Sequence, residues 1–254
     1  MTRHEILYIK ETITGLPRER LILENPILDE QQNKEYNNIL NRRKKGEPLQ
    51  YILGTWEFMG HTFKTDPRAL IPRFETELLV EKALETAKNF KNPRILDICT
   101  GSGCIAISIA KAINANITAT DISQDAISLA QENAELNNVN INFICTDIID
   151  GLEDEKYDII ICNPPYIPTH ELRNLMIDVK DYEPILALDG GSDGMDIYKR
   201  VLEKCKYMTD ILLFEIGPIE VRELMVYYGY KTKLFYDYAE LPRILWGERE
   251  CLTV

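Results

Sequence analysis

The residues Asn163-Pro164-Pro165-Tyr166 are the part of this 254-residue sequence best suited to chemistry. They follow an apolar run over residues 157–162, which predicts a buried parallel strand. Proline has no backbone N–H, so two consecutive prolines must end the strand in a stiff turn. The side-chain oxygen of Asn163 and the carbonyls of Asn163 and Pro164 then become fixed acceptors for a planar NH2 group, with the flat face of Tyr166 beside them. Such a turn favours an enzyme that uses an amide or exocyclic amine as its nucleophile.

A glycine-containing loop, Leu96-Asp97-Ile98-Cys99-Thr100-Gly101-Ser102-Gly103, joins a predicted strand to a predicted helix. Glycines at such a point let the backbone approach a ligand closely. Read from Gly101, the sequence also satisfies the dinucleotide pattern G-x-G-x-x-A, and Asp121 stands about 20 residues further on, where it could accept hydrogen bonds from ribose hydroxyls. This pattern alone leaves an NAD-dependent oxidoreductase open.

Further acidic residues favour S-adenosylmethionine over NAD. Asp97 stands where a carboxylate can reach a cationic amino group, and Asp147 ends the third predicted strand, near the place of an adenine amine. Each acid has a plainer interpretation, because Asp97 could interact with a helix dipole, Asp121 could cap a helix and Asp147 could be a turn residue. Parallel sheets bind ligands at the carboxyl ends of their strands, and these acids and the N-P-P-Y turn follow successive strands. The NAD interpretation leaves that turn without a role.

Strands and helices alternate from residue 94 onward, which predicts an α/β fold with a mostly parallel sheet covered on both faces. The expected strands span residues 94–99, 116–120, 141–145, 157–162, 211–216, 231–236 and 243–252. The expected helices span residues 105–113, 124–136, with Ser123 as the N-cap, and 219–227.

The first part of the chain has a different pattern. Apolar residues recur at helical spacing between residues 6 and 45, interrupted by Gly15-Leu16-Pro17 and Asn25-Pro26, which predicts a small helical domain. A hairpin is expected between residues 51 and 63, and a further helix from residue 78. We therefore expect a helical domain at 1–48, which could recognise a substrate or only stabilise the rest of the chain, a hairpin and linker at 49–77, and a catalytic domain at 78–254.

Composition excludes several classes of partner. The net charge of −12 argues against tight binding to a nucleic-acid backbone. No apolar stretch is long enough to span a membrane and no signal peptide is evident, so a cytoplasmic protein is expected. The six cysteines form no C-x-x-C pair and the three histidines are scattered, so no metal site is expected. Four cysteines, in strands or beside the glycine loop, are expected to be small buried hydrophobes.

These motifs resemble those of the PrmC/HemK family, the release factor glutamine methyltransferases. The resemblance covers nearly the whole chain and is weakest before Pro48. The glycine loop, the Asp121 strand end and the N-P-P-Y turn are shared by many enzymes that methylate amino groups. Residues 48–54, 58–60 and 70–77 and parts of 182–194 distinguish this family from the others. The sequence departs from the family pattern at Phe74, usually proline, at Cys99, usually glycine, at Glu220, where glutamine is expected, and in a looser terminal motif, Trp246-Gly247-Glu248-Arg249.

The resemblance implies a seven-stranded Rossmann-like class I methyltransferase sheet with a small N-terminal helical domain. It implies methyl transfer from S-adenosylmethionine to the side-chain amide nitrogen of the glutamine in the Gly-Gly-Gln motif of peptide chain release factors. The implied cofactor-binding residues are Asp97, Cys99, Thr100, Gly101, Ser102, Gly103, Asp121, Asp147, Ile148 and Asn163. The implied substrate-binding residues are Asn163, Pro164, Pro165 and Tyr166, of which Asn163, Pro164 and Tyr166 would be catalytic.

Two alternatives remain open at this point. An adenine-N6 nucleic-acid methyltransferase would use the same turn to hold an exocyclic amine, but it should show a basic groove. A non-catalytic cofactor-binding scaffold would have no need of the side chains of Asn163 and Tyr166. The sequence leaves the preferred release factor, the oligomeric state and any interdomain motion undetermined.

Overall fold

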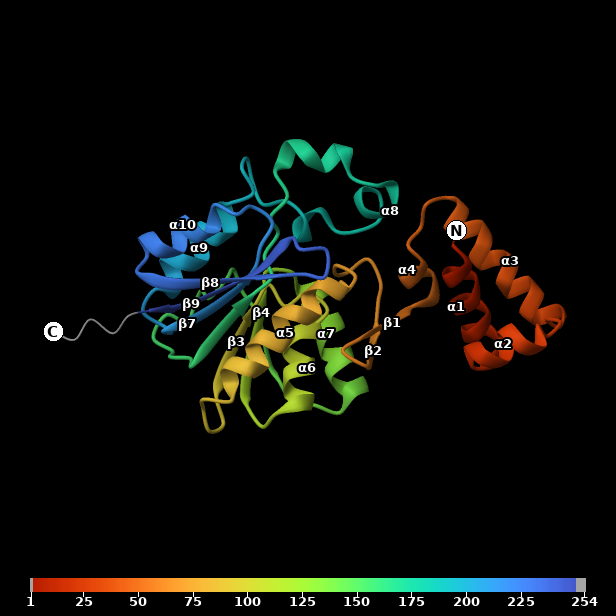
Figure 1. The fold of residues 1–254 in the computed structure, drawn as a ribbon, viewed down its shortest axis with the longest axis horizontal. Coiled ribbons are helices and arrows are strands. Elements are labelled where there is room, and N and C mark those ends of the chain that lie inside the picture. Colours follow the sequence, from red (N-terminus) through yellow and green to blue (C-terminus); the bar gives the residue numbers. More distant parts are fainter. Residues whose placement is uncertain (1, 250–254) are drawn as a thin grey trace.

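A computed structural model describes residues 2–249. Figure 1 shows a group of N-terminal helices beside a larger α/β part, and the two are connected in the chain through a short hairpin. The helices are α1 (Arg3–Thr14), α2 (Arg18–Glu24), α3 (Glu30–Lys44) and α4 (Leu49–Leu53). The helices expected in this part of the chain are therefore present, with breaks at the expected Gly-Leu-Pro and Asn-Pro positions.

Local sequence explains these helix ends. Thr2 and Asp29 each form a capping box, in which the side chain of the cap accepts a hydrogen bond from the backbone of the third helical residue. Ile9, Ile39 and Leu49 form the small core, so α4 continues the helical layer five residues past the expected boundary at residue 48.

The hairpin consists of β1 (Thr55–Phe58) and β2 (His61–Lys64), as expected. Its buried aromatic rings, Phe58 and Phe63, meet edge to face with centroids 6.0 Å apart. This packing fixes the hairpin against the α/β part, because both rings belong to the main hydrophobic core.

Seven strands form one sheet in the order β5-β4-β3-β6-β7-β9-β8, in which β9 runs antiparallel to the other six. The predicted seven-stranded α/β sheet is confirmed, with ends that shift by one or two residues. The last expected strand stops at Arg249, and its residues 250–252 lie outside the described part of the chain. The strands are β3 (Arg94–Ile98), β4 (Asn116–Asp121), β5 (Asn142–Cys145), β6 (Ile159–Cys162), β7 (Ile211–Glu215), β8 (Tyr230–Tyr236) and β9 (Pro242–Arg249).

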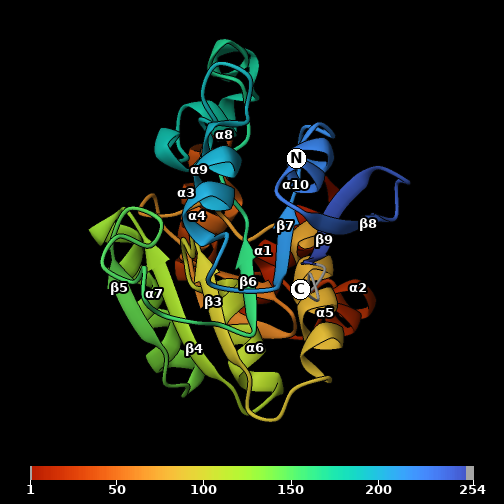
Figure 2. The same ribbon diagram turned by 90° about the vertical axis from the view of Figure 1, so that its left-hand side faces the viewer.

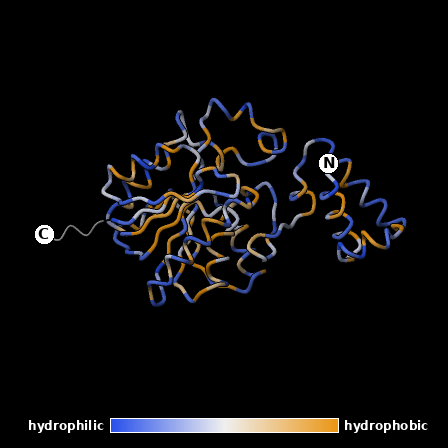
Figure 3. Tube along the Cα trace, viewed as in Figure 1, coloured by the Kyte–Doolittle hydropathy of each residue, from blue (hydrophilic) through white to orange (hydrophobic). Residues whose placement is uncertain are grey.

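Helices cover both faces of the sheet (Figure 2). One face packs against α5 (Phe74–Ala87), α6 (Cys104–Ala112) and α7 (Gln124–Asn137), and the other against α9 (Asp196–Cys205) and α10 (Val221–Tyr227). Alternate residues of β6 enter the two cores, so this strand is apolar throughout, and Figure 3 shows the central strands as the most hydrophobic part of the chain. The sequence analysis did not predict α9, and it placed the start of α5 at residue 78 instead of Phe74.

A segment between β6 and α9 rises above the carboxyl edge of the sheet (Figure 2). It contains η1 (Thr169–Asn174), α8 (Ile177–Lys180) and η2 (Ile185–Ala187). Asp178 of this segment forms an ion pair with Arg43 of α3, and the hydroxyl of Tyr182 donates to the Lys45 carbonyl at 3.2 Å. The segment therefore contacts the N-terminal helices directly.

Two further expectations concern the burial of the cysteines and the presence of membrane-spanning helices. Cys104, Cys162 and Cys205 are buried and Cys99 is partly buried, but Cys145 is exposed at the edge strand β5, so the expectation that it is buried was wrong. None of the helices within residues 2–249 has both the length and the apolar character needed to cross a bilayer.

Candidate active site

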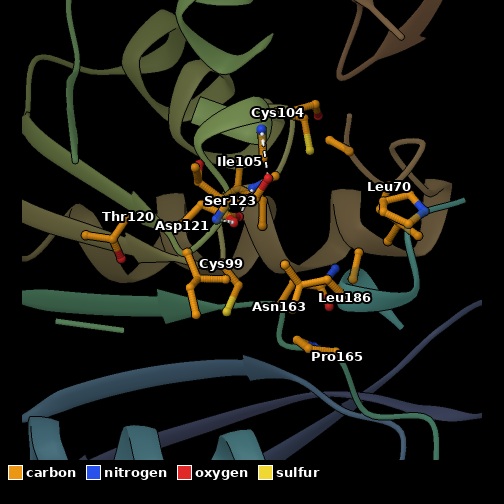
Figure 4. Close-up of a pocket in the computed structure, with 18 of the residues that line it drawn as sticks. Leu70, Cys99, Cys104, Ile105, Thr120, Asp121, Ser123, Asn163, Pro165 and Leu186 are labelled. Atoms are coloured by element: carbon orange, nitrogen blue, oxygen red, sulfur yellow. Dashed lines mark hydrogen bonds between the residues drawn. The ribbon is translucent and has the colours of Figure 1, made fainter. Parts of the chain in front are cut away.

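A cavity lies at the carboxyl ends of β3, β4 and β6, where an open parallel sheet binds ligands. Figure 4 shows Cys99, Asp121, Ser123, Asn163 and Pro165 around this space. Nine of the residues expected to bind cofactor or substrate line it: Cys99, Thr100, Gly101, Ser102, Asp121, Asp147, Ile148, Asn163 and Pro165. The other four, Asp97, Gly103, Pro164 and Tyr166, are not among its lining residues.

The loop after β3 is held by its backbone conformation. Cys99 has a φ of 60° and Gly101 a φ of 54°, so two residues near the start of the loop take the left-handed conformation. Gly103 also has a positive φ, and a Cβ there would lie 3.0 Å from the Ala130 side chain of α7. Gly103 therefore permits the loop to pack closely on α7 beneath the cavity. This position explains why Gly103 is not a lining residue.

Asp121 connects this loop to the end of β4. Its Oδ2 accepts a hydrogen bond from the backbone N–H of Gly101 at 2.9 Å, and its Oδ1 accepts one from the N–H of Ser123 at 2.9 Å. Burial raises the pKa of Asp121, while these backbone donors oppose the rise. Each oxygen retains a lone pair, so the carboxylate at the cavity wall can still accept hydrogen bonds from a ligand.

Asp97, which was expected to bind the cofactor, is not among the residues that line the cavity. Its side chain is fully buried in β3, and Oδ2 accepts a hydrogen bond from the Thr100 hydroxyl at 2.6 Å. Burial raises the pKa of Asp97 to about 7. Its Oδ1 is buried beneath the glycine loop, near the backbone N–H of Ala106 at the start of α6, which opposes the rise in pKa. In this structure Asp97 supports the loop through Thr100.

Asp147 and Ile148 follow β5 and both line the cavity. The Asp147 carboxylate forms an ion pair with Arg200 of α9, which also lines the cavity. Ile148 has a φ of 61°, and its carbonyl accepts a hydrogen bond from the Thr120 hydroxyl at 2.8 Å. The hydrogen bond from Thr120 holds the strained backbone of Ile148 in place. The buried Ile148 side chain gives the cavity an apolar wall.

Some residues of the N-P-P-Y turn line the cavity, and others pack into the protein interior. Asn163 and Pro165 line the cavity, whereas Tyr166 packs so closely on Gly217 that a Cβ there would lie 2.4 Å from the tyrosine ring. Burial raises the pKa of Tyr166 to about 12, so its hydroxyl remains protonated at neutral pH. Gly217 follows β7, and Tyr166 thereby fixes the turn against the neighbouring strand end.

Two segments that the sequence analysis did not assign to the site also line the cavity. One is residues 68–73 with Thr76, and the other is the part of the segment after β6 that contributes Pro184, Leu186, Ala187 and Asp189. Arg73 joins the two segments, because its guanidinium contacts both carboxylate oxygens of Glu183 at 2.6 and 2.8 Å. Both segments contain motifs that carried the family resemblance, which was the available signal.

The residues present fit a nucleoside cofactor such as S-adenosylmethionine. Asp121 supplies a carboxylate for ribose hydroxyls at the end of β4, next to a glycine loop that permits close approach. Ile122 and Ile148 supply apolar surface for a flat base, and the Asp147 carboxylate lies in the same wall. Residues 2–249 contain no group of three or more His, Cys, Asp or Glu side chains arranged to hold a metal ion.

Family models match both parts of the chain. A PrmC N-terminal domain matches residues 2–54, and a methyltransferase small domain matches residues 74–179. A release factor glutamine methyltransferase of Thermodesulfovibrio yellowstonii is 38% identical over 237 residues, covering 89% of this chain and 85% of that protein. The chain belongs to the release factor glutamine methyltransferase family.

A second family member, from Fusobacterium nucleatum, is 43% identical over 204 residues. That match covers 78% of this chain but only 58% of the relative's length. Family membership makes the chain an S-adenosylmethionine-dependent methyltransferase, in agreement with the methyltransferase small domain model and the features of the cavity.

Solved structures agree with the fold. A methyltransferase from Pyrococcus furiosus superposes with a TM-score of 0.55 at 18% identity, covering 86% of this chain and 99% of that one. The T. Thermophilus 16S rRNA N2 G1207 methyltransferase, solved in complex with AdoMet and guanosine, gives a TM-score of 0.56 at 15% identity and covers 77% of this chain and 50% of that one. Both have the class I methyltransferase sheet.

Three of the four departures from the family pattern, Phe74, Glu220 and the terminal motif, are not among the residues that line the cavity. Phe74 is exposed and stacks on Tyr238 with ring centroids 6.1 Å apart, and Glu220 is the N-terminal flanking residue of α10. In the looser terminal motif, Gly247 packs against Met225 and Tyr230 of the core. Cys99 departs inside the site itself, at a backbone conformation that favours the family's glycine.

Proposed function

We propose that this protein transfers a methyl group from S-adenosylmethionine to the side-chain amide nitrogen of the glutamine in the Gly-Gly-Gln motif of peptide chain release factors. The observation that carries the proposal is that Asn163 and Pro165 of the N-P-P-Y turn line the same cavity as the glycine loop and Asp121. The relatives named as release factor glutamine methyltransferases support the choice of substrate.

The bound cofactor supplies a methyl group on a positively charged sulfur, which is ready for in-line transfer. We assign its binding to Asp121, Asp147 with Ile148, Asn163 and the loop Cys99, Thr100, Gly101, Ser102 and Gly103, with Asp97 acting through the loop. Asp121 would accept hydrogen bonds from the ribose, and the loop would give the backbone close access to the ligand.

The nucleophile needs help, because the lone pair of an amide nitrogen is delocalised into its carbonyl. In this proposal the Asn163 side-chain oxygen and the Pro164 carbonyl accept the two amide hydrogens. Fixed acceptors stabilise the positive charge that grows on the nitrogen during transfer. They also aim the nitrogen, and positioning of this kind supplies a large part of catalysis. No strong base is required, because the methylated cationic amide readily loses a proton.

The remaining roles follow from the fold. Pro165 and Tyr166 would hold the turn and the plane of the glutamine amide, with Tyr166 acting from its packed position against Gly217. The helical domain would help to hold the release factor, since it contacts the segment that covers the cavity. We expect the enzyme in the cytoplasm, because the proposed substrate takes part in translation.

Transfer of labelled methyl from S-adenosylmethionine tests this function. Purified release factor should be labelled, and the same factor with Gln→Ala in its Gly-Gly-Gln motif should not. Equal labelling of both factors would contradict glutamine methylation. Labelling of neither, with cofactor binding confirmed by calorimetry, would reject the substrate class and favour an adenine amine in nucleic acid.

A further inference from the structure

The side chain of Asn163 is connected to two buried residues outside the N-P-P-Y turn. Its Nδ2 lies 3.3 Å from Oγ1 of Thr76, the third residue of α5. The same Thr76 hydroxyl donates to Oε2 of Glu215, the last residue of β7, at 2.6 Å. Thr76 is 2% exposed and Glu215 3% exposed, so the hydrogen bond between them is buried.

The sheet register explains how these groups meet. Strands β6 and β7 are parallel, with Cys162 opposite Phe214, so Asn163 and Glu215 are the next residues on adjacent strand ends. Helix α5 crosses both strands and brings Thr76 to them. Glu215 is also held from the far side, because its backbone carbonyl accepts a hydrogen bond from Tyr198 at 2.9 Å.

The direction of these hydrogen bonds decides which end of the Asn163 amide faces the cavity. A threonine hydroxyl has a single proton, and here Thr76 gives it to Oε2 of Glu215, which only accepts when the carboxylate is ionised. Burial raises the pKa of Glu215, and the Thr76 hydrogen bond and Arg243 oppose the rise by favouring the ionised form. Thr76 can then only accept from Asn163, so it must face the NH2 group of that side chain. The Asn163 oxygen is left free, since no group within residues 2–249 donates to it, and Asn163 lines the cavity.

We propose that Thr76 and Glu215 are positioning residues that fix the Asn163 amide with its oxygen toward the substrate. The role rests on the proposed function, in which that oxygen accepts a hydrogen from the glutamine NH2. An Asn163 amide turned by 180° would present its own NH2 to the substrate NH2, and two donors cannot form a hydrogen bond. The Glu215 carboxylate thus sets the orientation of the Asn163 oxygen through Thr76 without contacting the substrate itself.

Substitutions at Thr76 test the proposal by kinetics. Thr76→Val keeps the shape but removes the hydroxyl, and should lower kcat about tenfold, the effect of one buried hydrogen bond, with KM for S-adenosylmethionine unchanged. Thr76→Ser restores the hydroxyl and should return kcat to within threefold of the wild type. Thr86→Val is the matched control, because Thr86 is a buried threonine of the same helix whose hydroxyl donates to Lys82 of that helix. Wild-type kcat in Thr76→Val would overturn the proposal.

A double-mutant cycle separates positioning from general support. If Thr76 acts through Asn163, adding Thr76→Val to Asn163→Ala should change kcat less than twofold, because the amide it orients is already gone. A further tenfold loss in the double variant would overturn the proposal. Thermal unfolding of each variant shows whether a loss of kcat reflects a loss of fold.

An NMR measurement tests the orientation without any methyl transfer, so it keeps the positioning role distinct from the proposed function. The Asn163 side-chain NH2 signals, assigned by their disappearance in Asn163→Ala, should show a nuclear Overhauser contact to the Thr76 methyl group. Absence of that contact would overturn the inferred orientation even if the release factor is methylated. Its presence, with no methylation of the release factor, would reject the proposed substrate and leave the orientation supported.

Discussion

Gly101 and Asp121 are joined by a backbone N–H to carboxylate hydrogen bond of 2.9 Å, which couples the loop after β3 to the end of β4. The other carboxylate oxygen accepts from Ser123, so Asp121 uses both oxygens on backbone donors. The residue therefore orders the loop before any ligand arrives, and the same carboxylate lines the cavity.

Asp121→Asn should weaken cofactor binding more than it changes the fold. An asparagine has a single acceptor oxygen and no charge, so the proposed ribose contact loses its charged acceptor and one of the two backbone N–H groups loses its partner. Hydrogen bonds to a charged acceptor contribute about 1.5–3 kcal/mol, which predicts a Kd for S-adenosylmethionine raised about tenfold to hundredfold. Isothermal titration measures this, with Asp125→Asn, an exposed acid in the first turn of α7, as the control. Equal affinity in the two variants would contradict the coupling.

The backbone conformation of Cys99 predicts which of two substitutions, glycine or alanine, gives the more stable protein. Its φ of 60° costs a residue with a Cβ about 1–2 kcal/mol relative to glycine. Cys99→Gly should therefore be more stable than Cys99→Ala by about 0.5–1 kcal/mol, after allowing for the greater entropy of glycine in the unfolded chain. Urea unfolding measures the difference. Ala110→Gly in helix α6 is the control and should show the opposite order, with alanine the more stable residue. A Cys99→Ala variant more stable than Cys99→Gly would contradict the strain.

The sequence was sufficient to predict the sheet because its strands are short apolar runs that end in recognisable turns. Asn163-Pro164 marks the end of β6, and the spacing from Gly101 to Asp121 places both at one edge of the sheet, where they are hydrogen-bonded. These signals are local, and family resemblance covered most of the rest.

The features that the sequence did not predict depend on contacts between distant parts of the chain. Asp97 was expected to bind the cofactor, which stays a prediction, but the sequence did not predict that its side chain is fully buried in β3. Thr76 and Glu215 lie 139 residues apart, and only the packing of α5 across β7 brings them together. Arg73 and Glu183 are 110 residues apart and likewise carried no local signal.

The Arg73–Glu183 pair should be important for stability. Glu183 is 5% exposed, so Arg73→Gln leaves a buried carboxylate without its charged partner, which typically costs about 3–5 kcal/mol. Burial already raises the pKa of Glu183 above its ordinary value of 4.5. The stability that comes from this raised pKa is fully present below pH 4.5 and is lost as pH rises through the folded value.

The loss caused by Arg73→Gln should therefore be larger at pH 8 than at pH 5. Chemical unfolding at the two pH values measures it. The double variant Arg73→Gln with Glu183→Gln removes the unpaired charge and should recover part of the stability at pH 8. A loss that is the same at both pH values, with no recovery in the double variant, would show that the ion pair is not the cause.

Asn163→Ala should damage turnover and leave cofactor binding nearly intact. Removal of one fixed acceptor from a charge-stabilising site typically lowers kcat about hundredfold or more. The Kd for S-adenosylmethionine should stay within about threefold, because the glycine loop, Asp121 and Ile148 supply most of the cofactor's surroundings. Single-turnover methyl transfer and calorimetry measure the two quantities, with Asn174→Ala, an exposed asparagine of η1, as the control. Wild-type kcat in Asn163→Ala would remove this residue from catalysis, and a large loss of cofactor affinity with unchanged kcat would limit its role to cofactor binding.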